Sequence, residues 1–115
     1  MTTSEIQTYQ PLSEATFLIL LSLSQRPKHG YAIAKDIHDL SNERVLLSVS
    51  TLYTTLKRLL EDGLIERFGE DAELDESGRP RKTYTLTELG RRLLASETVR
   101  LNSLVIAAKL RGVEA

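Results

Sequence analysis

The sequence predicts a mainly α-helical domain of the α+β class, in which three helices precede a small β-hairpin and one long helix follows it. Apolar residues recur at helical spacing in three segments, 13–24, 31–40 and 48–62. Two short segments with strand-like patterns, 64–68 and 82–86, flank a polar loop. A last periodic segment runs from 88 to about 110, which is longer than one small domain requires.

Length and composition limit the functions to consider. With 115 residues the chain suits one domain with a modest core, and it is short for an enzyme with a deep cleft. A formal net charge of −1 and a pI near 6.1 mean that any DNA-binding surface must be a local basic face. The absence of cysteine agrees with a cytoplasmic protein. The apolar run 17–23 is too short to span a membrane, and no signal peptide is recognised.

The first part of the chain divides into an arm and two helices. Residues 1–11 are polar and lack periodicity, so we expect a flexible N-terminal arm. The helix 13–24 is apolar almost all round, which predicts burial on more than one side and a face turned to a second subunit. After the turn 25–30, a helix over 31–40 presents an inner apolar face. The short apolar run 45–47 is expected to form a small strand.

The segment 48–62 is the one around which the others are organised. Ser48 is the expected N-cap, and Gly63 the residue that ends the helix in a left-handed conformation. Its predicted apolar stripe consists of Val49, Leu52, Leu56, Leu59 and Leu60. Its other side carries hydroxyls, a phenol and two cations, and the acids come only at the end. Such a face suits a major groove, although an ordinary solvated helix face has the same pattern.

The strands 64–68 and 82–86 are expected to pair as a hairpin, or wing, with Tyr84 and Leu86 directed inward. The loop between them begins acidic and ends in a basic tip, 78–81, that contains a proline. Thr87 is the expected cap of the long last helix. Three helices followed by such a hairpin are the order of a winged helix-turn-helix domain, for which we predict residues 12–87. Residues 88–115 are then a C-terminal dimerisation helix.

Three motifs carry a family resemblance: HGYAI at 29–33, STLYTTLKRLLEDGLI at 50–65 and GRPRKTYTLTELG at 78–90. In this order and at these separations they resemble the PadR family of transcriptional regulators, over about residues 12–94. The resemblance implies a homodimeric DNA-binding repressor, held together by its C-terminal helix and in many members responsive to small aromatic or drug-like molecules. The wing loop here is longer and more acidic than the family pattern, and the chain has no tryptophan.

Candidate contacts with double-stranded DNA lie on the third helix and the wing. They are Ser50, Thr51, Tyr53, Thr54, Lys57, Arg58, Arg79, Arg81 and Lys82. Lys57 is the long cation best able to reach a phosphate or a base, and Tyr53 occupies the position of the family's recognition-helix tyrosine. Arg58 can serve likewise or be solvated. Tyr31 is interpreted as structural, packing its helix on the first one.

Further expectations concern the subunit interface and the alternatives. The dimerisation residues are predicted to be Leu101, Leu104, Val105 and Ala108. An effector, if one binds, should lie between the N- and C-terminal helices, with Phe17 as its aromatic contact. His29, His38, Asp36 and Asp39 have poor spacing for a shared metal, so neither a metal nor a cofactor is expected. No catalytic pair or phosphate-binding glycine loop is found, which argues against an enzyme. A winged helix used only for protein–protein contact remains the alternative.

Overall fold

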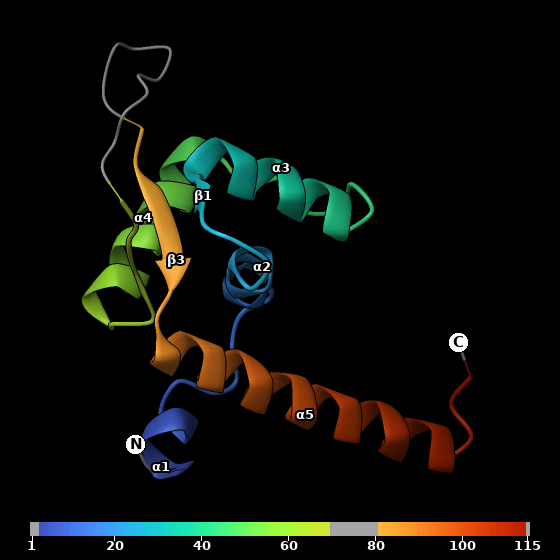
Figure 1. Cartoon of the computed structure of the whole chain (residues 1–115). Helices are drawn as coiled ribbons and strands as arrows, with labels where there is room; N and C mark the ends of the chain where they lie inside the picture. The colour runs from blue at the N-terminus through green and yellow to red at the C-terminus, as the bar shows by residue number, and fades with distance from the viewer. Residues whose placement is uncertain (1–2, 70–80, 115) are drawn as a thin grey trace.

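The computed structural model describes residues 3–69 and 81–114 (Figure 1). Within them the order is α1 (Thr3–Gln7), α2 (Glu14–Leu23), β1 (Lys28–His29), α3 (Gly30–Leu40), α4 (Val49–Glu61), β2 (Ile65–Arg67), β3 (Thr83–Leu86) and α5 (Glu88–Leu110). This confirms the predicted helical domain with a small sheet and a long last helix. Residues 70–80, which include the acidic loop and the basic tip except Arg81, fall outside the described residues.

The core lies where α2 meets α3, α5 and the sheet. Its fully buried apolar side chains come from five elements and the turn before β2: Ile19, Leu20 and Leu23 of α2, Ile33 and Ile37 of α3, Leu56 and Leu59 of α4, Leu64 of the turn, Ile65 of β2 and Leu93 of α5. Because α2 has neighbours on several sides, the chain itself covers most of its apolar surface. The all-round apolar character of α2 therefore does not require a second subunit, and Phe17 is only partly buried against the core.

The sheet has the order β1-β3-β2, with both pairings antiparallel. Tyr84 and Leu86 of β3 are buried as predicted. The strand expected at 45–47 is absent: this stretch is an extended link, and Leu46 is exposed. The third strand is instead β1. It brings Lys28 into the interior, where Nζ donates to the Ser22 carbonyl oxygen at 2.7 Å and to Asp36 Oδ2 at 2.8 Å.

The predicted N-caps of the helices before and after the wing, α4 and α5, are both confirmed. The Ser48 hydroxyl accepts from the Thr51 backbone N–H at 3.1 Å, and the Thr87 hydroxyl accepts from that of Gly90 at 3.1 Å. Gly63 has φ +73°, the left-handed conformation that ends α4. Val49 departs from the expected apolar stripe, because it is the first residue of α4 and 73% of its surface is exposed.

The long helix α5 has two different halves. Its first half packs on α2 and β3 and buries Leu93, Leu94 and Glu97, so the winged-helix core continues past the expected boundary at residue 87. Its second half projects away from the domain (Figure 1). The terminal arm, expected to lack structure, includes α1, which packs against α5. The arm prediction is thus corrected at residues 3–7.

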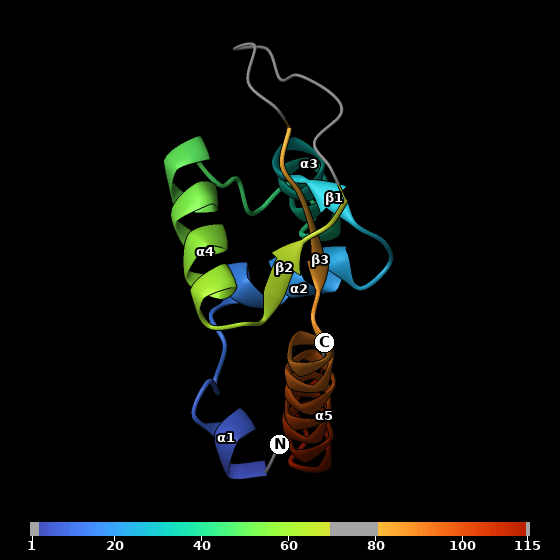
Figure 2. The same cartoon turned by 60° about the vertical axis from the view of Figure 1, so that its left-hand side comes forward.

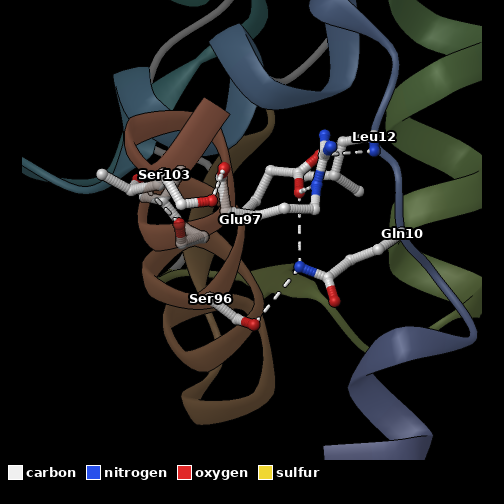
Figure 3. Close-up of polar contacts among 8 residues, drawn as sticks. Gln10, Leu12, Ser96, Glu97 and Ser103 are labelled. Carbon is white, nitrogen blue, oxygen red and sulfur yellow. Dashed lines mark hydrogen bonds and ion pairs between the residues drawn. The ribbon is translucent and has the colours of Figure 1, made fainter. Parts of the chain in front are cut away.

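A buried carboxylate joins the arm to α5 where that helix leaves the core (Figure 3). Glu97 is only 1% exposed, and it accepts from the Leu12 backbone N–H at 2.7 Å and from the Gln10 side-chain amide at 3.3 Å. Arg100 donates to it through Nη2 at 2.9 Å. The hydrogen bond from Arg100 lowers the pKa of Glu97, with a smaller contribution from the Leu12 N–H, although burial acts in the opposite direction.

Candidate nucleic-acid interface

The outer face of α4 carries hydroxyls, a phenol and a cation. Figure 2 shows α4 at one edge of the domain, with α2, α3 and the sheet to the other side of it. Leu52, Leu56 and Leu59 face that interior. The exposed side chains on the predicted DNA face are Ser50, Thr51, Tyr53, Thr54 and Lys57. The first carboxylate on α4 is Glu61, its last residue, so most of the face has no negative charge to repel phosphate.

Lys57 and Arg58 are adjacent in sequence but differ in surroundings. Lys57 is exposed, and over residues 3–69 and 81–114 no ion pair engages it. Arg58 instead reaches toward α2, where Nη2 donates to the Thr16 hydroxyl at 3.0 Å. It also lines a cavity of about 230 Å³ whose other walls include Tyr9, Leu12 and Asp62. The structure therefore does not bring Arg58 together with Lys57 on one outward face.

The start of α3 forms a second part of this surface. His29 is the N-cap of α3, and its Nδ1 accepts from the Ala32 backbone N–H at 3.3 Å. Its ring stacks on Tyr31 with centroids 6.5 Å apart, and its Nε2 lies 3.2 Å from Arg81 Nη1. The structural role expected of Tyr31 is wrong, since 73% of this residue is exposed. The HGY motif at 29–31 was the feature of the sequence that could have predicted a functional surface at the start of α3.

The wing contributes cations from both of its strands. Arg81 and Lys82 lead into β3, and Lys82 is exposed. Arg67 of β2, which was not among the predicted contacts, places its guanidinium carbon 6.0 Å from the centre of the Tyr84 ring. Arg79 lies outside the described residues.

Two of the four residues considered as metal ligands have structural roles. His29 caps α3, and Asp36 forms an ion pair with Lys28.

The predicted dimerisation residues all lie on the projecting half of α5. Leu104 is 55% exposed and Leu101 37%, and Val105 is exposed to a similar degree. The predicted dimerisation set does not include a second apolar group, Val99, Ile106 and Leu110, which is also exposed. At about 100° per residue these three fall on nearly the opposite side of the helix from Leu101 and Leu104. This half of α5 is therefore apolar on two sides.

Phe17, the predicted effector contact, does not line the cavity that the described residues form beside α5. That cavity, of about 410 Å³, lies between the end of α2 and the first half of α5. The residues that line it expose mostly apolar surface to the cavity, and they are Ser24, Leu86, Arg91, Leu94, Ala95 and Thr98.

Across the described ranges, no helix has the length and apolar character needed to cross a membrane.

Relatives of the chain include two curated proteins. An uncharacterized 37.1 kDa protein in a transposon of Streptomyces fradiae is 38% identical over 85 residues, 74% of this chain and 22% of that protein. Uncharacterized protein X of Lysinibacillus sphaericus is 31% identical over 78 residues, 68% of this chain and 69% of that protein. The chain thus spans about a fifth of the length of the first relative.

Solved structures share the fold over most of the chain. A PadR family transcription regulator from Clostridium difficile is 26% identical with a TM-score of 0.69, covering 85% of this chain and 97% of that one. Bacillus subtilis PadR in complex with operator DNA is 24% identical with a TM-score of 0.62, covering 76% and 46%. Residues 19–96 match the family described as the transcriptional regulator PadR-like family. This chain belongs to that family.

Proposed function

We propose that the protein is a homodimeric repressor that binds an inverted-repeat operator in double-stranded DNA in the cytoplasm. The observation that carries the proposal is the outer face of α4, which combines hydroxyl groups with the exposed Lys57 and has no acid before Glu61. Hydroxyls and long cations are the groups that contact phosphates and base edges in a major groove. Bacillus subtilis PadR, which shares the fold, was solved in complex with operator DNA, and this supports DNA as the partner.

The second half of α5 supports the dimer. In one chain alone its apolar side chains are exposed to water, Leu104 and Leu110 by more than half of their surface. A symmetric mate that covered them would remove this apolar surface from water and would fix two copies of α4 relative to each other. In helix-turn-helix dimers the recognition helices lie roughly 34–36 Å apart, so the half-sites should be centred about 10 bp apart or a multiple of that.

The proposal includes release of DNA by a small aromatic or drug-like effector. The mostly apolar cavity of about 410 Å³ beside α5 is within the usual size range of small-molecule sites. Phe17 of α2 does not line it and stays the aromatic residue proposed for a site between the subunits. A panel of planar aromatic compounds should contain members that raise the melting temperature and weaken DNA binding. If no compound does either, an effector-independent repressor is the better account.

Selection from random duplexes tests the central claim. The protein is mixed with a library of random 40-bp DNA in the presence of competitor DNA, and bound duplexes are amplified and sequenced over several rounds. We expect enrichment of a two-fold symmetric sequence, and binding of the selected duplex by the protein in a gel shift at stated salt. If no sequence is enriched, the proposal fails, and a winged helix that binds another protein is favoured.

A further inference from the structure

We infer that Gly30 is a positioning residue for DNA binding, because the space left by its missing side chain holds the Tyr53 hydroxyl at the junction of α3 and α4. The inference deepens the proposed function and rests on it. Gly30 is the first residue of α3, and it is buried. Tyr53 lies one turn into α4 and is 45% exposed, so its phenol belongs to the same outer face as Lys57.

The contact between the two residues leaves no room for a methyl group. A Cβ atom on residue 30 would lie 2.6 Å from the Tyr53 hydroxyl oxygen, 3.0 Å from Cζ and 3.3 Å from Cε1. Carbon and oxygen atoms that are not bonded do not pack this closely, so one of the two groups would have to move. The hydroxyl therefore reaches its present position only because residue 30 is glycine.

The group that would move is the phenol. The backbone of Gly30 is held between the His29 cap of α3 and Ile33, which is completely buried in the core. The Tyr53 ring turns about two side-chain torsions, and its end lies near the surface. An alanine at residue 30 should consequently shift the Tyr53 hydroxyl and leave both helices in place.

This hydroxyl is well placed to contact a phosphate. Throughout the described ranges no hydrogen bond engages it within the chain, so it is available as a donor. Next to Gly30 in sequence, His29 and the exposed Tyr31 form the aromatic start of α3, and Arg81 of the wing lies 3.2 Å from His29. Tyr53 thus stands between the face of α4 and the basic end of the wing, where a DNA backbone that follows both elements would pass.

The test measures binding of the parent and of Gly30→Ala to the selected duplex. Loss of one hydrogen bond to a charged phosphate should weaken binding about tenfold for each subunit of the dimer. The salt dependence of binding should stay the same, because a neutral hydroxyl releases no counterion. The melting temperature should not fall, since alanine is a better helix former than glycine. A variant that binds weakly through general distortion of the basic surface would instead lose part of its salt dependence.

A double-mutant cycle connects the effect to Tyr53. Tyr53→Phe removes only the hydroxyl and should cost about the same tenfold loss. Gly30→Ala combined with Tyr53→Phe should then be no weaker than either single variant. Tyr9→Phe, which removes a hydroxyl from the N-terminal arm, is the matched control: it should leave binding unchanged, and the Gly30→Ala loss should be the same in its presence.

Each possible result either supports or overturns the role of Gly30 in positioning Tyr53. Parental affinity in Gly30→Ala, or losses that add in the cycle, would overturn the role of Gly30 while leaving the proposed function standing. If the parent itself selects no DNA, the proposed function fails and the inference fails with it. If Gly30→Ala does not fold, Gly30→Ala with Tyr53→Ala must fold, because the collision has been removed. A double variant that stays unfolded would show that glycine is needed for the α3 backbone and not for Tyr53.

Discussion

The outer face of α4 and the projecting half of α5 are both exposed helical surfaces, yet they differ in chemistry. On α4 the exposed side chains are mostly hydroxyls and cations, whereas on α5 they include Val99, Leu104, Ile106 and Leu110. The first kind of surface is stable in water and gains by contacting a polyanion. The second is unfavourable in water and gains by contacting another apolar surface. The same helical geometry therefore presents two surfaces that suit different kinds of partner.

The two surfaces also differ in how they are attached to the core. Three buried leucines, Leu52, Leu56 and Leu59, anchor the inner side of α4, which packs against α3 and β2. The projecting half of α5 continues beyond its last buried residue, Glu97, and the proposed mate is what would hold it. We therefore expect changes on α4 to alter contacts one at a time, and changes on α5 to alter every contact at once.

The largest effect is expected from Leu101→Asp combined with Leu104→Asp. Both side chains lie outside the core, so the variant should remain helical by circular dichroism and become a monomer by light scattering. Loss of two-site binding should weaken operator affinity by about 100-fold or more. Asn102→Asp, which adds one charge on a polar side of the same helix, is the control and should remain dimeric. A double variant that is still a dimer would place the interface elsewhere.

The second effect concerns Glu97, which marks the boundary between the two halves of α5. Glu97→Gln removes the charge that accepts from Leu12 and Arg100, and should lower the free energy of unfolding by about 2 kcal/mol in urea at fixed protein concentration. Glu88→Gln, at the exposed start of the same helix, should change it by less than about 0.5 kcal/mol. Equal effects would mean that the buried network does not hold the arm.

The pH dependence of this effect has a definite sign. The pKa of Glu97 is lowered in the folded chain, so its charge stabilises the fold at pH values above the ordinary glutamate pKa of about 4.3. That stability is lost as the pH falls through the lowered pKa. The difference between the parent and Glu97→Gln should therefore be full near neutral pH and should shrink as the solution is acidified below about pH 4.3.

Local signals were easier to predict than contacts between distant parts of the chain. The caps at Ser48 and Thr87 and the turn at Gly63 depend on residues within one turn of helix, and all three were correct. β1 was missed because two residues carry no periodicity, and it exists only through pairing with β3 more than fifty positions away. The apolar run 45–47 looked more like a strand but has no partner strand in the described sheet.

The candidate functional surfaces were also easier to predict where they depend on local sequence than where they depend on distant contacts. The exposed face of α4 and the apolar excess of α5 could be predicted, because each depends on the spacing of residues within one helix. Two features could not: the role of Glu97, whose partner Leu12 is 85 positions away, and the proximity of Gly30 to Tyr53. Arg58 was assigned to the DNA face from its place in the sequence, yet its guanidinium contacts Thr16 of α2.

The third prediction distinguishes a DNA contact made by α4 from a general effect of surface charge. Lys57→Ala should weaken operator binding and lower the salt slope by about 0.9 for each phosphate that is no longer neutralised, or about 1.8 in a dimer with two copies. Replacing Arg79 and Arg81 together should also lower the slope. Arg92→Ala on α5 removes the same charge far from α4 and should leave the slope unchanged. Equal changes in Lys57→Ala and Arg92→Ala would mean that only net charge matters.

The smallest effect is expected at Glu61, the one acid on α4. It lies on the exposed side of the last turn, one turn after Lys57, and its charge opposes that of phosphate. Two unit charges about 8 Å apart in water interact by roughly 0.5 kcal/mol, so Glu61→Gln should raise affinity about twofold at low salt. The gain should fade as salt is added.

Glu88→Gln is the matched control for Glu61→Gln, since it makes the same change of charge on α5. It should leave operator affinity unchanged if the DNA lies along α4. Both variants can be compared by titrating the selected duplex at two salt concentrations. A rise in affinity for Glu61→Gln alone would extend the DNA-facing surface to the last turn of α4. If neither variant binds more tightly, the contact must end earlier, near Lys57, and α4 would meet the groove with its first three turns only.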